Sequence, residues 1–363
     1  MSDLIICATR SMRNYASQVV GHLAKFPEFA NAVEDGVNLL QTDRFADGEL
    51  EVVVNSSIRG KTVIVFTSSA RGEADISVEE AKIELYHAID ALKRSHAAKV
   101  IVFEPFISSS RSDRTARRSS VGLFVHLKTL TSLGVQHIVT YQLHSDKSKS
   151  MVDPAICAID DIPALKLLKM YLCDNYIHSL ENLEHEVRTK WAFCSVDAGG
   201  EKIGRVFANA FGAPLVIAHK QRDYSRLNSV DSVNILTAEP LKDKVLWVVD
   251  DMIDTAGSVD TLIRALVPLE PKEINIVAVH ALFSPPAAQR IAALKRDCLL
   301  NRIIVTDTVC CSPALCSTIP GLEVVPSAGL SAHIVKGVAT NGSMTRLLSP
   351  FDASAYFKSP QLF

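Results

Sequence analysis

The chain has 363 residues, of which 48% are hydrophobic and 21% are charged, and its formal net charge is −2. This composition is typical of a globular protein with two domains of roughly 150 residues each. It gives no support for a nucleic-acid or membrane partner, and no apolar run approaches the ~20 residues that span a bilayer. The start does not read as a signal peptide and the eight cysteines contain no CxxC pair, so we expect a cytoplasmic protein with reduced cysteines.

Strands alternate with helices in the first half of the chain. The opening apolar stretch reads as a first strand, and buried apolar runs predict further strands over residues 61–67, 99–103 and 135–143. Apolar residues at helical spacing predict amphipathic helices over 78–95 and 123–133. This alternation predicts an α/β domain with a mostly parallel sheet flanked by helices.

The second half repeats this plan. Strands are expected over residues 191–196, 214–218, 245–249, 274–279 and 302–305, with helices after residues 200 and 258. We place one domain at 1–160 and the other at 161–345, and expect the tail over 346–363 to pack back on the first. Residues 174–189 are polar and helix-like, and read as an excursion from the fold.

Residues 245–258 carry the strongest single pattern. An apolar run over 245–249 is followed by polar and small residues, namely Asp250, Asp251, Asp254, Thr255, Ala256, Gly257 and Ser258. A strand, a tight turn and a helix start then form an anion cradle, because free N–H groups and the helix dipole point at the turn. The acids are placed to accept hydrogen bonds from sugar hydroxyls or to hold Mg²⁺ through water. The plain alternative is a buried strand with a solvated acidic turn and a capped helix.

This stretch resembles the phosphoribosyl-diphosphate motif shared by type I phosphoribosyltransferases and ribose-phosphate diphosphokinases (PRPP synthases). Other segments resemble the PRPP synthases in family order, at 44–49, 54–60, 83–99, 111–114, 143–144, 196–200, 220–222 and 279–284. The resemblance covers nearly the whole chain. It implies two tandem phosphoribosyltransferase-like (type I) domains, with ATP bound on the N-terminal side and ribose 5-phosphate on the C-terminal side.

The activity that the resemblance implies is a Mg²⁺-dependent transfer of the β,γ-diphosphoryl group of ATP to the anomeric hydroxyl of ribose 5-phosphate. The products are 5-phosphoribosyl 1-diphosphate and AMP. The resemblance also implies a homodimer that assembles into a hexamer. Such a transfer depends on positioning and charge neutralisation, so no nucleophilic side chain is needed.

The resemblance assigns roles to individual residues. The residues matched to ATP binding are Phe45, Asp47, Glu49, Arg111, Ser112, Asp113 and His144, the first three acting across a subunit interface. His144 and Asp197 match the Mg²⁺ ligands, and the 250–258 residues named above match the ribose 5-phosphate site. The diphosphate loop is Asp197, Ala198, Gly199 and Gly200. Lys220 and Arg222 match catalytic cations on a flexible loop that closes over the phosphates.

Several alternatives stay open at this point. His144 alone reads as a core histidine, and an isolated Lys220-x-Arg222 reads as surface charge. Ser112 stands where the family has glutamine and Gln142 where it has aspartate, which gives weight to a non-catalytic regulatory paralogue. A phosphoribosyltransferase is a further alternative, although the complete first domain speaks against it.

Overall fold

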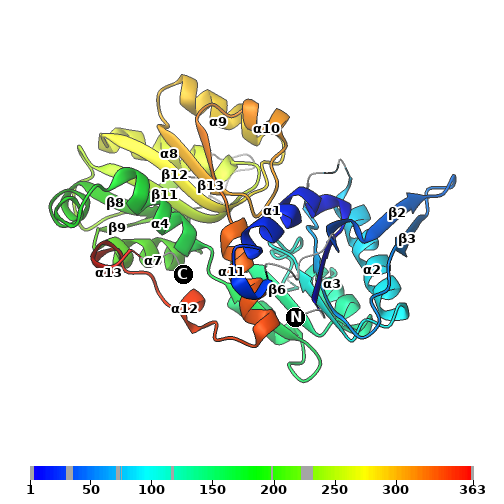
Figure 1. Ribbon diagram of the computed structural model, residues 1–363. Helices are drawn as coiled ribbons and strands as arrows, with labels where there is room; N and C mark the ends of the chain where they lie inside the picture. Colours follow the sequence, from blue (N-terminus) through cyan, green and yellow to red (C-terminus); the bar gives the residue numbers. More distant parts are fainter. Residues whose placement is uncertain are drawn as a thin grey trace.

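The computed structural model describes residues 4–29, 36–70, 74, 76–115, 118–197, 199–221 and 232–360. These residues form two α/β domains side by side, each with a sheet between layers of helices (Figure 1). The expected fold class is therefore confirmed. None of the helices described has the length and apolar character needed to cross a bilayer.

The N-terminal sheet has the strand order β1-β4-β5-β6-β7, and all neighbouring strands are parallel. Its strands are β1 (Leu4–Ala8), β4 (Thr62–Phe66), β5 (Lys99–Phe103), β6 (His137–Tyr141) and β7 (Ala158–Ile162). The main helices of this half are α1 (Arg13–Leu23), α2 (Val78–Arg94) and α3 (Gly122–Ser132). One face of the sheet packs on the apolar sides of α2 and α3, and the other packs on α1.

The C-terminal sheet has the order β10-β9-β8-β11-β12-β13-β14, with only the edge pair β10 and β9 antiparallel. The strands are β8 (Trp191–Ser195), β9 (Leu215–Gln221), β10 (Ser232–Leu236), β11 (Val245–Ile253), β12 (Glu273–Ala281), β13 (Arg302–Thr306) and β14 (Leu322–Val325). One face packs on α4 (Leu165–Tyr176) and α7 (Glu201–Phe211), and the other on α8 (Gly257–Leu266) and α9 (Ala287–Arg296).

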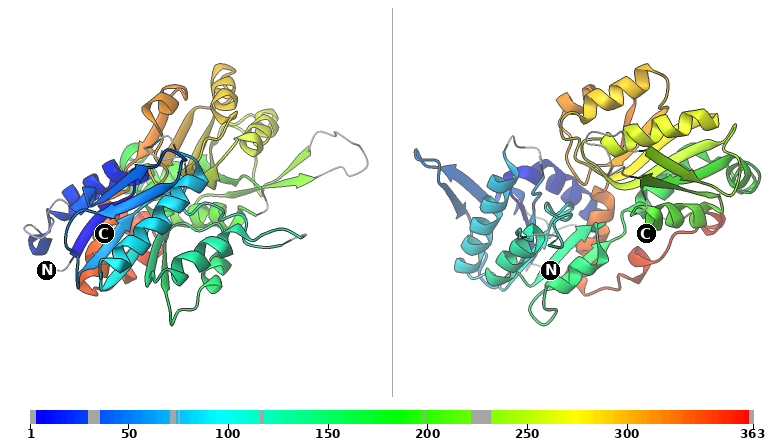
Figure 2. Two further views of the ribbon diagram at one scale, coloured as in Figure 1. Left: turned by 90° about the vertical axis from the view of Figure 1, so that its right-hand side faces the viewer. Right: turned by 180° about the vertical axis from the view of Figure 1, so that it is seen from behind.

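A late helix joins the two halves. Helix α11 (Ala328–Thr340) packs against α1 between the domains, as two opposite views show (Figures 1 and 2). The hydroxyl of Tyr15 on α1 lies 2.6 Å from Ser327 Oγ and 2.7 Å from Ser331 Oγ. Tyr141, at the end of β6, lies 2.6 Å from the same Ser331 oxygen. As a result, one hydrophobic core runs through both domains.

The structure corrects three expectations about the chain's course. The tail does not return to the N-terminal sheet: α13 (Ala353–Lys358), which follows α12 (Thr345–Leu348), contacts α4, α5 (Leu180–Asn182) and α7. Residues 174–189 are not an excursion, because Leu183 and Val187 in the π-helical turn Leu183–Val187 are buried in the shared core. Strand β11 continues through the two adjacent aspartates to Ile253, since its pairing with β12 extends that far.

A two-stranded arm was not anticipated. Strands β2 (Leu40–Arg44) and β3 (Leu50–Val54) pair antiparallel and project from the N-terminal domain on the side away from the C-terminal domain (Figure 1). Residues 44 to 49, where the motif with Phe45 lies, form the tip of this arm. The site residues expected there are thus held far from the C-terminal sheet of the same chain.

Candidate active site

Polar groups from both domains surround a cavity of about 360 Å³ at the carboxyl edge of the C-terminal sheet. The sequence-predicted site residues in its lining are Arg111, His144, Asp197, Gly199, Gly200, Asp250, Asp251, Asp254, Thr255, Ala256, Gly257 and Ser258. Carboxyl ends of parallel strands meet at one edge of a sheet, which explains why residues so far apart in the sequence converge here.

The turn between β11 and α8 forms the anion cradle. Ala256 precedes the helix and adopts the left-handed conformation, with φ 57°, which is uncommon for a residue with a Cβ and is found mostly where surrounding structure imposes it. Arg290 Nη1 of α9 donates a 2.8 Å hydrogen bond to the Thr255 carbonyl and so holds the turn from behind. The first N–H groups of α8, which no helical carbonyl can satisfy, border the cavity.

Asp250 and Asp251 are adjacent in β11, but their pKa values are shifted in opposite directions. Burial raises the pKa of Asp250 well above its usual range, and the neighbouring charge of Asp251 raises it further. Burial also raises the pKa of Asp251, but the hydrogen bond and charge of His144, together with Asp250 and His280, outweigh burial and leave that pKa below its usual value. Asp251 is therefore the more acidic member of the pair.

Two ion pairs cross from the N-terminal domain to this strand end. His144 Nδ1 lies 2.7 Å from Asp251 Oδ2, and this hydrogen bond raises the pKa of His144. Arg111 Nη2 lies 2.6 Å from Asp254 Oδ2. Burial raises the pKa of Asp254, but hydrogen bonds from Ser284 and Arg111 bring it below its usual value. The cavity therefore takes its cationic wall from one domain and its acidic wall from the other.

The loop after β8 closes a third side of the cavity. Asp197 Oδ1 accepts a 2.9 Å hydrogen bond from the Gly200 N–H, just before α7 begins. A Cβ on Gly199 would lie 3.2 Å from the same carboxylate oxygen, closer than most side chains come to a neighbour. A small residue is therefore required for this tight turn. Ala198, the remaining member of the expected diphosphate loop, is outside the described residues.

The donor set suits a hard cation that is shared with a ligand. Among the described residues, no three His, Cys, Asp or Glu side chains converge to hold a metal ion. Mg²⁺ commonly takes one or two protein carboxylates together with waters and phosphate oxygens. Asp250 and Asp197 fit that pattern, because both carboxyl groups line the same cavity. His144 already directs Nδ1 to Asp251, so only Nε2 is left as a donor to metal.

Comparison with known proteins agrees with this architecture. The model of the N-terminal domain of ribose phosphate pyrophosphokinase matches residues 4–134, and the phosphoribosyl transferase domain matches residues 174–305. A ribose-phosphate pyrophosphokinase from Ureaplasma parvum is 30% identical over 310 residues, which are 85% of this chain and 86% of that protein. The chain belongs to the ribose-phosphate pyrophosphokinase family.

Two further relatives extend this result. A ribose-phosphate pyrophosphokinase from Bifidobacterium longum is 29% identical over 337 residues, covering 90% of either chain. The crystal structure of phosphoribosylpyrophosphate synthetase from Mycobacterium smegmatis matches with a TM-score of 0.78 and 27% identity, covering 94% of this chain and all of that one. The family resemblance that the sequence motifs indicated is thus confirmed, at a level of identity that marks a divergent member.

Some of the residues matched to the family's ATP site lie away from the cavity. Phe45, Asp47 and Glu49 are at the tip of the arm, where the Phe45 side chain is 51% exposed. Ser112 is turned inward: its Oγ accepts a 3.0 Å hydrogen bond from the Gly122 N–H at the start of α3. Asp113 adds to the electrostatic field that raises the pKa of His144 but is not part of the described cavity lining.

The catalytic cations proposed from the motif cannot be placed. Lys220 is in β9, where its backbone pairs with Val233 of β10, but its side chain is outside the described part of the chain. Arg222 lies wholly outside the described residues. Their roles stay predictions.

Two contributors to the site were not among the predicted site residues. Arg290 supports the Thr255 turn from α9, and only its basic charge at a helical position distinguishes it in sequence. His280, at the end of β12, bonds the Gln142 carbonyl through Nε2 at 3.2 Å and Thr308 Oγ1 through Nδ1 at 2.9 Å. Its position at a strand end was the available signal. Gln142, with φ 45°, thus contributes a backbone carbonyl to the joint between the domains.

Proposed function

We propose that this chain is an active ribose-phosphate pyrophosphokinase, which transfers the β,γ-diphosphoryl group of ATP to the anomeric hydroxyl of ribose 5-phosphate. The observation that carries the proposal is the single cavity in which the α8 cradle and its acids face Arg111 and His144 of the other domain. In this cavity, the α8 cradle can bind a phosphate monoester while the cationic side chains of the other domain face a polyphosphate.

Each group of residues has its own role in the proposed reaction. In the proposal, the N–H groups around Gly257 and Ser258 bind the 5-phosphate, while ionised Asp251 and Asp254 accept bonds from ribose hydroxyls. Arg111 binds on the nucleotide side. Bound Mg²⁺ would neutralise polyphosphate charge, with Asp197 and Asp250 as its protein oxygen ligands and His144 beside it. Lys220 and Arg222 would meet the charge that develops on the transferred group.

The test is one reaction followed by phosphorus NMR, with ATP, ribose 5-phosphate and Mg²⁺. AMP together with a new diphosphate attached to ribose is the expected result. Asp197→Asn provides the internal control, because it should weaken the dependence on Mg²⁺ and leave thermal stability nearly unchanged. A wild-type protein that leaves both substrates intact would contradict the proposal.

A second candidate is a regulatory paralogue that assembles with an active synthase. The observation favouring it is Ser112, whose hydroxyl is bonded at the start of α3 and offers no amide to adenine. It predicts an inactive chain that changes the turnover of an added active family member. The same NMR assay, with that member present, separates the two functions.

We also propose that the chain acts as a dimer or a higher assembly. The arm holds Phe45 exposed and far from the cavity of its own chain, as expected if it completes the nucleotide site of a second copy. Light scattering on the wild type and on a Phe45→Asp variant tests this. A monomeric wild type with full activity would contradict it.

A further inference from the structure

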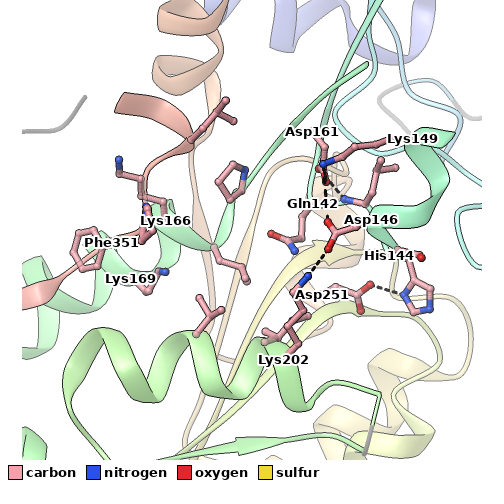
Figure 3. Close-up of a pocket in the computed structure, with 18 of the residues that line it drawn as sticks. Gln142, His144, Asp146, Lys149, Asp161, Lys166, Lys169, Lys202, Asp251 and Phe351 are labelled. Atoms are coloured by element: carbon pink, nitrogen blue, oxygen red, sulfur yellow. Dashed lines mark hydrogen bonds and ion pairs between the residues drawn. The ribbon is translucent and has the colours of Figure 1, made fainter. Parts of the chain in front are cut away.

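A second and larger pocket lies between the domains, beside the candidate active site. It has a volume of about 590 Å³ and shares His144, Asp251, Gly199 and Ile203 with the smaller cavity. Its far end is bounded by α4 and by the stretch 348–351 of the C-terminal tail. Figure 3 shows this pocket, with Lys166, Lys169 and Phe351 at one end and His144 and Asp251 at the other.

Lys169 is unusual because it is buried without a counter-charge. The residue is only 4% exposed, and no described carboxylate forms an ion pair with it. Its Nζ lies between two aromatic rings, 5.7 Å from the centroid of Phe207 and 5.7 Å from that of Phe351. Cation–π contacts offset only part of the cost of removing an ammonium group from water. Burial and the nearby charge of Lys166 lower the pKa of Lys169 to about 8.

The charges at the two ends of the pocket differ. Near His144, two lysines are paired, Lys202 with Asp146 and Lys149 with Asp161 at 3.5 Å, and Lys147 is exposed to solvent. At the α4 end, Lys166 donates a 2.8 Å hydrogen bond to the Arg346 carbonyl and, like Lys169, has no carboxylate partner among the described residues. That end therefore carries two positive charges with no protein anion to balance them.

We infer that the interdomain pocket binds a small phosphorylated ligand whose phosphate lies between Lys166 and Lys169. A phosphate dianion matches two uncompensated ammonium groups, whereas a carboxylate would balance only one. Leu165, Val206 and Phe351 supply an apolar wall for the rest of the ligand. The volume falls in the range of roughly 300–1,000 Å³ that is usual for small-molecule sites, so a sugar phosphate or a nucleotide fits. The inference does not require the proposed reaction, but a ligand in this pocket would contact His144 and Asp251, which also line the candidate active site.

The test measures the melting temperature of the full chain against inorganic phosphate, with chloride at equal ionic strength as the reference. A ligand that binds only the folded state raises the melting temperature with its concentration. Lys169→Met keeps the length of the side chain and removes its charge. We expect this variant to melt at or above the temperature of its parent with Lys169 intact in chloride, because a buried uncompensated charge is gone. Its apparent dissociation constant for phosphate should rise roughly tenfold or more.

Lys128→Met is the matched control. Lys128 makes a similar contact, 5.8 Å from the ring centroid of Phe124, but is not part of the pocket. It should leave the response to phosphate unchanged. All four proteins, including the parent with Lys169, Lys166 and Lys128 intact, carry Gly257→Val, which is intended to weaken the competing cradle at α8. Lys166→Gln gives a second reading at a less buried position and should also weaken phosphate binding. Equal phosphate responses in all four proteins would overturn the inference.

Discussion

Both sheets carry polar groups at the carboxyl ends of their strands, but these groups line an open cavity in one domain and are buried in the other. In the C-terminal domain the polar groups after β8 and β11 face an open cavity. In the N-terminal domain the polar groups after β1, β4 and β5 face one another and are buried. Thr9 Oγ1 donates to Thr67 Oγ1 at 2.9 Å, and the Ser68 N–H donates to Ser11 Oγ at 3.0 Å.

Glu104 is the centre of this closed edge. It accepts hydrogen bonds from the N–H and Oγ of Ser69 and lies 3.0 Å from His126 Nε2, while His126 Nδ1 lies 2.9 Å from the Tyr86 hydroxyl. Ser69 Oγ also accepts from the Ser108 N–H, at the start of the loop that leads to Arg111. The same fold thus provides a cavity at one edge and a buried polar network at the other. What distinguishes the two edges is burial, because the polar groups of the open edge line a cavity and those of the closed edge are enclosed by the protein.

The largest effect should come from removing the two cations that are proposed to act on the transferred group. We predict that Lys220→Ala and Arg222→Ala each lower turnover on the order of 10³-fold with little change in melting temperature, because both would stabilise one charged transition state. For the same reason, the double variant should lose less than the product of the two single losses. Steady-state kinetics on the three variants provide the check. Lys242→Ala, which removes a surface lysine paired with Glu270, should leave turnover unaltered, and near-normal rates in both single variants would reject the mechanism.

Breaking the closed edge should instead cost stability. We predict that Glu104→Ala lowers the free energy of unfolding by about 3 kcal/mol, because Ser69 and His126 lose a buried partner. The Michaelis constant for ribose 5-phosphate should change little, since Glu104 is not part of the described cavity lining. Urea denaturation and kinetics on the same preparation measure both quantities. The double variant Glu104→Leu/His126→Leu should recover part of the loss, and a loss as large as in Glu104→Ala would argue against a coupled polar network.

A histidine at the open edge should make stability depend on pH. Burial lowers the pKa of His280 to about 4, whereas the unfolded chain has its ordinary value of 6.5. Between these values the unfolded state binds the proton that the folded state excludes, so stability falls as pH falls, by about 1.4 kcal/mol per unit. Acidification from pH 6.5 to pH 5 should therefore cost about 2 kcal/mol. The slope of unfolding free energy against pH should be shallower in His280→Gln, and identical slopes would contradict the assignment.

The smallest predicted effect concerns the cradle itself. A Cβ on Gly257 would lie 3.1 Å from Arg290 Nη1, which supports the Thr255 carbonyl. We predict that Gly257→Val raises the Michaelis constant for ribose 5-phosphate roughly tenfold, or about 1.4 kcal/mol, while that for ATP stays near normal. Gly257→Ala should show a smaller change of the same kind. Equal losses for both substrates would indicate a folding defect instead.

The sequence predicted the parts of the fold in which one physical signal dominates. Long apolar runs located β4, β5, β8 and β11, and helical spacing located α2 and α7, because burial alone decides such segments. Strand β7 was missed since it carries Asp160 and Asp161 at a sheet edge, where solvent and Lys149 can satisfy charge. The arm was missed because its strands are short and mostly half-solvated, which leaves a weak alternation.

Prediction of the site from the sequence was limited in the same way. The acids of 250–254 and the small residues after them were recognisable because they lie together in sequence. The pairing of His144 with Asp251 was not, since it joins residues of different domains and depends on how the domains dock. Lys169 gave no signal at all: it is one of two lysines in an apolar helix, and only the packing of Phe207 and Phe351 around it reveals its burial.

The position of α11 has a consequence for synthesis of the chain. Strands β1, β4, β5 and β6 come early, yet one face of their sheet packs on a helix that the ribosome makes near the end. Until residues 328–340 emerge, α1 lacks its packing partner, and Tyr15 and Tyr141 lack the serine hydroxyls that they bond in the finished protein. The first half is therefore left with exposed apolar surface during elongation, and a transcript truncated before α11 should yield a product that aggregates or recruits chaperones.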